Sequence, residues 1–200
     1  MANIIIIHCT RGSPDSHWLP WLKEELGKSG HDIIIPKFPT PDGQNLGNWL
    51  EAFMPYEKYL TDGSILIGHS IGCAFALNLI ERTDANLEAC FLVAGFIEDL
   101  ENSTFTPLNH TFYENGFDWT KIRTSCKNFY IYGSDNDPHV SLRNIHSLSS
   151  KLGTKEIIVN NAGHFNTASG YVQFPLLLED IKKHLNSKSN TSSTIYQKVL

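Results

Sequence analysis

Three residue types that together can break an acyl bond occur in order along the chain. Ser70 lies in the stretch GHSIG, His164 lies in NAGHFN, and the segment YGSDNDPHV between them carries Asp135 and Asp137. A serine hydroxyl is a poor nucleophile at neutral pH, so it needs a general base that is itself oriented by a third group. The pattern indicates nucleophilic catalysis, with Ser70 as nucleophile, His164 as base and one of the two aspartates as acid.

The sequence around Ser70 is typical of a sharp turn between a strand and a helix. The apolar run SILI precedes GHSIG, and the helical pattern CAFALNLIER follows it. A serine at such a turn holds a strained backbone, and glycine on either side lets neighbouring segments pack closely against it. The alternative is a turn serine without chemistry, but the flanking elements favour the nucleophile.

The elements that must position these residues are short apolar strands separated by helices. Near-continuous apolar runs are typical of strands covered on both faces. The expected strands are 3–8, 32–38, 64–68, 89–95, 128–133 and 156–161. Helical patterns occur at 16–30, 45–60, 71–82, 141–152 and 171–185. This alternation predicts an α/β fold, a three-layer α/β/α sandwich around a mainly parallel six-stranded sheet. A nucleophile, acid and histidine in that chain order are typical of the α/β-hydrolase fold.

Composition and charge limit the classes of partner. The chain has 200 residues, 41% of them hydrophobic, so we expect one domain over residues 1–186. Residues 187–200 open polar and aperiodic, and we expect a mobile tail there. The formal net charge of −5 would repel nucleic acid and anionic membranes. No apolar run approaches the roughly 20 residues of a membrane span, and signal-peptide features are missing, so we expect a cytoplasmic protein.

The cysteines and the acidic residues do not form a recognisable metal motif. The four cysteines are Cys9, Cys73, Cys90 and Cys126. They lie in or beside apolar segments without Cys/His ligand spacing, so we expect reduced, buried side chains. A metal site can be imagined among Asp135, Asp137, His139 and His146. Because that set resembles neither HExxH nor an EF-hand loop, we predict no metal and no cofactor.

One long segment interrupts the alternation of strands and helices. Residues 97–122 show no strand pattern but contain five aromatic residues. A long insertion without regular structure is often a lid or a binding loop. We therefore expect Phe112, Tyr113 and Trp119 to bind substrate. The alternative is that these rings pack on the core.

The chain resembles a known family over most of its length, from residue 4 to about 166. The matching segments are IIHCTRGSPDSHWLPWLKEEL, LIGHSIGCAFAL, FDWTKIR, YGSDNDPHV and NAGHFN. They are similar to the small serine hydrolases of the α/β-hydrolase superfamily related to retinoblastoma-binding protein nine and to bacterial YdeN, which have a minimal cap. The resemblance implies Ser70 as nucleophile, Asp137 as acid and His164 as base. Cys9 departs from the pattern, because relatives usually have glycine after the histidine.

The remaining histidines and the oxyanion hole complete the expected site. His69 and His139 adjoin proposed catalytic residues, but neighbouring side chains tend to point apart, so neither is the expected base. We assign His69 to the substrate-binding residues and expect His8 to shape the first loop. The oxyanion donors are backbone N–H groups, expected from Ile71 and from the loop HCTRG. In that loop Thr10 is the expected donor and Arg11 the alternative.

Together these features predict a serine hydrolase that cleaves a small or medium carboxylic ester, or a related acyl bond, through an acyl-enzyme. The predicted partner is a small-molecule ester, with neither nucleic acid nor membrane. The alternative is a binding protein that keeps the hydrolase fold, because fold alone does not determine function.

Overall fold

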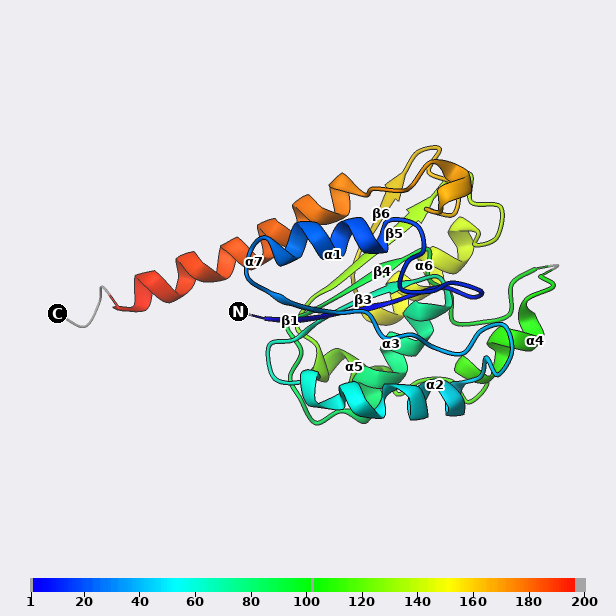
Figure 1. Cartoon of the computed structure of the whole chain (residues 1–200), viewed down its shortest axis with the longest axis horizontal. Helices are drawn as coiled ribbons and strands as arrows, with labels where there is room; N and C mark the ends of the chain where they lie inside the picture. The colour runs from blue at the N-terminus through cyan, green and yellow to red at the C-terminus, as the bar shows by residue number, and fades with distance from the viewer. Residues whose placement is uncertain (1, 102, 197–200) are drawn as a thin grey trace.

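Six parallel strands form a single sheet, and the strands run across the view in Figure 1. The structure is a computed structural model that describes residues 2–101 and 103–196. The strands are β1 (Asn3–Ile7), β2 (Asp32–Ile34), β3 (Ile65–His69), β4 (Ala89–Val93), β5 (Phe129–Ser134) and β6 (Glu156–Val159). Their spatial order is β2-β1-β3-β4-β5-β6. The predicted α/β fold is confirmed, and all five strand pairings in the sheet are parallel.

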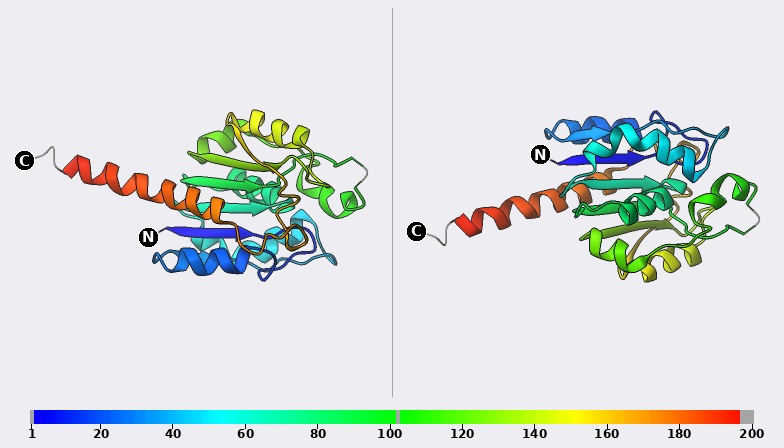
Figure 2. Two further views of the ribbon diagram at one scale, coloured as in Figure 1. Left: turned by 90° about the horizontal axis from the view of Figure 1, so that it is seen from above. Right: turned by 90° about the horizontal axis from the view of Figure 1, so that it is seen from below.

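Helices cover both faces of the sheet (Figures 1 and 2). The longer ones are α1 (Leu19–Gly27), α2 (Leu46–Phe53), α3 (Ile71–Arg82), α5 (Trp119–Ser125), α6 (Leu142–Leu152) and α7 (Pro175–Tyr196). In β1, Ile4 and Ile6 pack into the cluster that includes α1 and α7, whereas Ile5 and Ile7 pack into the cluster that includes α2 and α3. Burial on both faces explains why the strand sequences are continuous apolar runs.

The first helices follow their sequence patterns with one change. Trp18, Leu22 and Leu26 form the expected stripe and are completely buried. The single helix expected over 45–60 is instead α2 followed by the 3-10 helix η1 (Met54–Tyr59). Pro55 lies at the start of η1, and because proline lacks an N–H it cannot continue the α-helical bonding pattern.

The insertion over 97–122 contains more regular structure than we expected. It carries a short helix α4 (Thr106–Asn109), a 3-10 turn η2 (His110–Phe112) and the start of α5. Asp118 caps α5 by accepting hydrogen bonds from the N–H groups of Thr120 and Lys121 at 3.0 and 2.9 Å. The expectation of an irregular loop was therefore wrong for these stretches, and the Asp118 cap is the local signal that would have revealed α5.

The C-terminal helix is longer than its sequence pattern. Helix α7 continues to Tyr196, beyond the helix expected over 171–185, and it extends away from the sheet in Figure 2. Its first turns dock Leu177 and Ile181 into the core, and a nucleated helix propagates readily where neither glycine nor proline interrupts it. Residues 197–200 lie outside the described part of the chain. None of the described helices has the length and apolar character needed to cross a bilayer.

Candidate active site

Ser70 occupies the turn between β3 and α3 in a backbone conformation that side chains rarely adopt. Its φ and ψ are 57° and −121°. A Cβ on Gly68 would lie 2.7 Å from the Gly72 oxygen, and one on Gly72 would lie 2.6 Å from the Ile7 oxygen. Both glycines are therefore required by close backbone approach, which is the physical basis of the G-x-S-x-G pattern. The turn aims the N-terminus of α3 at the edge of the sheet where the strands end.

Asp137 and His164 meet in the loops that follow β5 and β6. His164 Nδ1 lies 2.8 Å from Asp137 Oδ2, and the Asp137 side chain is 1% exposed. The other carboxylate oxygen, Oδ1, accepts hydrogen bonds from the N–H groups of His139 and Val140 at 2.8 and 3.1 Å. Because both oxygens are held, the carboxylate fixes the direction of the imidazole ring, with Nδ1 as donor and Nε2 free to accept a proton.

A set of hydrogen bonds ties the loop after β5 to the loop after β6. Ser134 Oγ accepts from Ala162 N–H at 3.0 Å, and Asp135 Oδ1 accepts from Asn161 N–H at 2.7 Å. Asn136 Oδ1 accepts from Gly163 N–H at 2.8 Å. Asp135 therefore bonds the backbone of the neighbouring loop, whereas Asp137 contacts His164. Ser134 and Asn136 were not among the predicted site residues, although the polar run that follows the apolar strand was a signal for them.

The loop after β1 is fixed by side chains from two other segments. Thr10 Oγ1 donates to Asn109 Oδ1 at 2.7 Å, and Gln44 Nε2 donates to the same oxygen at 2.7 Å. Arg11 N–H donates to Thr40 Oγ1 at 2.8 Å, so this amide is already used. Among the described residues, the N–H groups of Thr10 and Ile71 donate to no protein acceptor. This difference favours Thr10 over Arg11 as an oxyanion donor.

A cavity of about 190 Å³ is lined by residues from these loops. Its lining residues are Cys9, Thr10, Arg11, His17, Ser70, Phe96, Leu100, Phe105, Asn109, His139, His164 and Asn166. Ser70 and His164 therefore face one space, with Thr10 on its wall and the apolar side chains of Phe96, Leu100 and Phe105 available to contact a ligand. Converging polar groups in a partly apolar hollow at the ends of parallel strands are typical of a ligand site in an α/β fold.

Comparisons with known proteins show the family to which the chain belongs. A family model described as serine hydrolase matches residues 4–183. The chain belongs to the serine hydrolase family. It is 28% identical over 189 residues to the hydrolase YdeN of Bacillus subtilis (strain 168), covering 94% of this chain and 98% of that protein. It is 24% identical over 169 residues to the serine hydrolase RBBP9 of Rattus norvegicus, covering 84% of this chain and 86% of that protein.

Similarity in three dimensions extends across the same range. The crystal structure of the ydeN gene product from B. subtilis superimposes with a TM-score of 0.86 at 29% identity, covering 93% of this chain and all of that one. The resemblance recognised in the sequence is confirmed. The protein is an enzyme of the hydrolase class with the α/β-hydrolase fold.

Three aromatic residues predicted to bind substrate lie away from the cavity of this hydrolase. Phe112 is 1% exposed, and its ring packs edge-on against Trp49 at 4.9 Å. Tyr113 is also buried, and its hydroxyl donates to Asp99 Oδ1 at 3.0 Å. Trp119 packs on the core beside Phe117. The expectation is corrected because apolar burial draws these rings inward, and the insertion contributes Phe105 to the cavity instead.

The histidines near the site have distinct surroundings. His69 is fully buried, and its Nε2 donates to the His164 carbonyl at 2.9 Å, so it supports the loop of His164 and does not line the cavity, contrary to our assignment. His8 donates Nδ1–H to the Cys9 carbonyl and accepts from Phe38 N–H at Nε2, which shapes the first loop. Burial lowers the pKa of His8 and His139 and holds the pKa of His69 well below its usual value.

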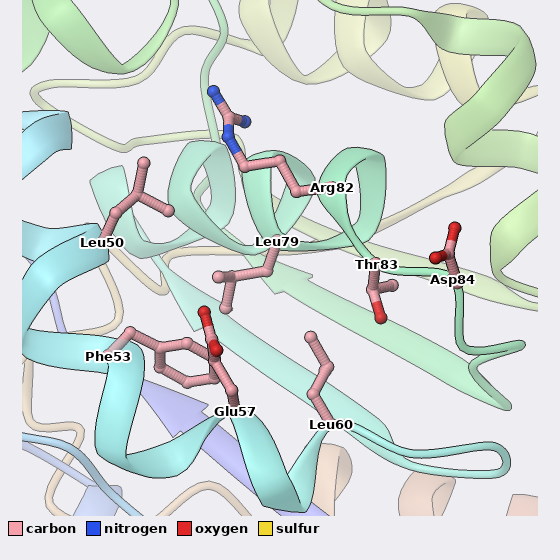
Figure 3. A pocket seen from close by; sticks show the side chains of 8 residues that line it. All are labelled: Leu50, Phe53, Glu57, Leu60, Leu79, Arg82, Thr83 and Asp84. Atoms are coloured by element: carbon pink, nitrogen blue, oxygen red, sulfur yellow. The ribbon is translucent and has the colours of Figure 1, made fainter.

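A larger cavity lies at the other end of α3. Its volume is about 280 Å³. As Figure 3 shows, it lies between the segment of α2 and η1 and the C-terminal end of α3, and it is lined by Leu50, Phe53, Glu57, Leu60, Leu79, Arg82, Thr83 and Asp84. The lining holds none of the proposed catalytic residues. The larger of these two cavities is therefore not the one that holds the proposed catalytic residues.

Proposed function

We propose that this serine hydrolase cleaves a small or medium carboxylic ester through an acyl-enzyme. Ser70 Oγ attacks the ester carbonyl, and His164 Nε2 accepts the hydroxyl proton and then returns it to the leaving alcohol. Water, activated by the same imidazole, releases the acid and regenerates Ser70. The observation that carries the proposal is the 2.8 Å contact between His164 Nδ1 and Asp137 Oδ2 beside a serine held in the strained turn.

In this mechanism Asp137 holds the imidazole in the tautomer that leaves Nε2 unprotonated and stabilises the imidazolium that forms. The negative charge that develops on the ester oxygen is accepted by the N–H groups of Thr10 and Ile71. Support comes from the lack of a protein acceptor for either group within the described residues. Ile71 also begins a helix of 12 residues, whose N-terminal partial positive charge favours an oxyanion. The scheme requires no metal or cofactor.

The acyl group of the substrate would contact Phe96, Leu100 and Phe105. Cavities for drug-sized ligands span about 300 to 1,000 Å³. The volume here, about 190 Å³, supports a smaller acyl group such as acetyl or butyryl. Thioesters with the same acyl chain could occupy this space in the same way.

Labelling with a fluorophosphonate probe tests the proposal directly. The parent protein should acquire one covalent label on Ser70, and p-nitrophenyl acetate should compete with labelling. Label on another residue, or none on folded protein, would contradict the nucleophile. Labelling without turnover of any p-nitrophenyl ester would favour the alternative of a binding protein that keeps the fold.

A further inference from the structure

Cys9, His17 and His69 bring a sulfur and two imidazoles together beside the catalytic cavity. They come from the loop after β1, the turn before α1 and the end of β3. Each offers one ligand atom, and the three atoms lie within 4.8 Å of one another. The Cys9 Sγ to His17 Nε2 distance is 3.5 Å. With Zn–S near 2.3 Å and Zn–N near 2.0 to 2.1 Å, a tetrahedral zinc site places its sulfur and nitrogen ligands about 3.6 Å apart.

His69 has the protonation that a metal ligand needs. Its Nε2 lies 2.9 Å from the His164 carbonyl, which can only accept, so the ring proton is on Nε2. The lone pair is then on Nδ1, which is buried and has no hydrogen-bond partner among the described residues. A backbone carbonyl that accepts the second ring N–H is the usual way in which proteins orient a metal-binding histidine. Buried polar atoms are rarely left unpartnered, so Nδ1 points to a missing ligand.

His17 and Cys9 can complete the site with a defined movement of protons. Thr167 N–H donates to His17 Nδ1 at 3.1 Å, so the neutral ring carries its proton on Nε2, towards Cys9. Metal binding places this proton on Nδ1, which then donates to Thr167 Oγ1, also at 3.1 Å. Thr167 N–H gives up its bond to Nδ1 in this step, and because Thr167 is exposed its N–H can bond water instead. The thiol of Cys9 releases its proton to solvent. Burial raises the pKa of this thiol to about 11, and a bound cation would offset that cost.

We propose that Cys9, His17 and His69 bind one Zn²⁺ ion and that the bound ion inhibits the hydrolase. One thiolate and two imidazoles suit zinc, whereas Mg²⁺ and Ca²⁺ prefer oxygen ligands. A fourth, water-occupied position would face the cavity that Cys9 and His17 line, which also provides the path of entry. Sequence spacing does not reveal the set, because each ligand comes from a different segment.

Inhibition follows from the position of the site. The rings of His69 and His164 lie 5.2 Å apart, and Cys9 and His17 share the cavity with Ser70 and His164. The proposed reaction makes His164 positively charged in its transition state. A cation held nearby opposes that charge, so the zinc-bound enzyme is slower. This second half of the inference rests on the proposed function, whereas zinc binding does not.

Equilibrium binding to the full-length, metal-free protein tests the site without reference to catalysis. Competition with a chromogenic chelator should show one Zn²⁺ per chain, and Co²⁺ should give a thiolate-to-metal absorption band. Cys9→Ala and His17→Gln should each weaken zinc binding at least ~10-fold, the lower end of what even an outer partner of a ligand contributes. Cys126→Ala is the matched control, because it removes another buried thiol outside the cluster and should bind like the parent.

Two results would overturn the zinc site. One is no stoichiometric binding by the folded parent at micromolar protein and zinc. The other is binding that survives Cys9→Ala or His17→Gln within threefold. Should His17→Gln fail to fold, Thr167→Val tests the same ligand by removing its Oγ1 acceptor, and a loss of about 10-fold is expected. Unchanged binding in that variant would also overturn the site.

Inhibition is measured separately on p-nitrophenyl acetate. Equimolar zinc should slow the parent, a chelator should restore the rate, and Cys9→Ala should need at least ~10 times more zinc for half-inhibition of its own zinc-free rate. Zinc binding without inhibition would overturn the inhibitory role and leave the site in place. If the metal-free parent hydrolyses no ester, the proposed function fails, while the binding measurements still decide the zinc site.

Discussion

Helix α3 begins at one cavity and ends at another, and the two cavities are lined by different kinds of residue. The smaller cavity, at the N-terminus of α3, is lined by Ser70 and His164. Asp137 contacts Nδ1 of His164. At the C-terminus of α3, about 18 Å away along a helix of 12 residues, the larger cavity collects Glu57, Arg82 and a group of leucines. Arg82 there donates to the carbonyl and side-chain oxygens of Asn78, within its own helix.

The smaller cavity, which holds the proposed active site, differs from the larger one by the hydrogen bonds that tie its loops together, and not by its volume. Around Ser70 the backbone is strained, and three side chains from the end of β5 and the loop after it bond the backbone that leads to His164. Such strain persists only where surrounding contacts over-determine the structure, and it is concentrated at functional sites. The larger cavity lies between packed helices, where substitutions should alter little but local packing.

The largest expected effect is on kcat, and it distinguishes the two cavities. Ser70→Ala should lower kcat for p-nitrophenyl acetate by at least ~10³-fold, since it removes the attacking atom. Thr83→Ala removes a hydroxyl from the larger cavity and should leave kcat within about twofold, as surface substitutions usually do. Circular dichroism should show both variants folded. Activity of Ser70→Ala within tenfold of the parent would reject the nucleophile.

The next effect distinguishes the two aspartates of the proposed active site. Asp137→Asn should lower kcat by at least ~10²-fold because the amide favours the wrong tautomer of His164. Asp135→Asn should cost less than about tenfold, since the amide oxygen can still accept from Asn161 N–H. The ratio of kcat values for two folded variants is the measurement. A reversed order of severity would make Asp135 the acid.

A pair of phenylalanines tests which part of the insertion faces substrate. Phe105→Ala should change the preference between acetate and butyrate esters by about 1 to 3 kcal/mol, the range for altered apolar pockets. Phe112→Ala should leave that preference unchanged but lower the free energy of unfolding by about 3 to 5 kcal/mol, because it opens a hole in the core. Kinetics on both esters and urea unfolding measure these effects. The opposite assignment of the two effects would restore Phe112 to the acyl pocket.

The smallest effect concerns the charged wall of the larger cavity. Glu57→Gln should change the free energy of unfolding by no more than about 0.5 kcal/mol and kcat by no more than about twofold, because the residue is exposed at a helical surface. Urea unfolding and ester hydrolysis provide both numbers. A loss of activity above tenfold with stability intact would show that the two cavities are coupled through α3.

The strands and the helix after Ser70 could be predicted because their packing is simple. Strands buried on both faces need continuous apolar sequence, so β1 and β3 are visible from their composition alone. Helix α3 was predicted with its observed bounds, because the GHSIG pattern is typical of a turn that joins a strand to a helix. The α7 extension was missed because a docked helix can continue through polar residues that show no periodicity.

That Ser70 and His164 lie at one cavity could be predicted for a topological reason. Loops that follow parallel strands gather at one edge of the sheet, so reactive side chains in those loops converge whatever their separation in the chain. The choice of Asp137 over Asp135 needed the family resemblance at first, and the structure adds the contact with His164. The misplaced rings, Phe112, Tyr113 and Trp119, show the limit of this reasoning, because an aromatic residue in an insertion can face the core or a ligand equally well.

The sequence by itself determined the layered α/β architecture, the turn at Ser70 and the order of the reactive residues, because these depend on local pattern and on chain direction. Only the tertiary structure decided which carboxylate meets His164, which insertion side chain lines the cavity, and that Cys9, His17 and His69 lie together. These outcomes depend on hydrogen bonds and packing between loops that are distant in the chain. Such contacts leave no periodic signal in the sequence, because the residues that make them are far apart in the chain.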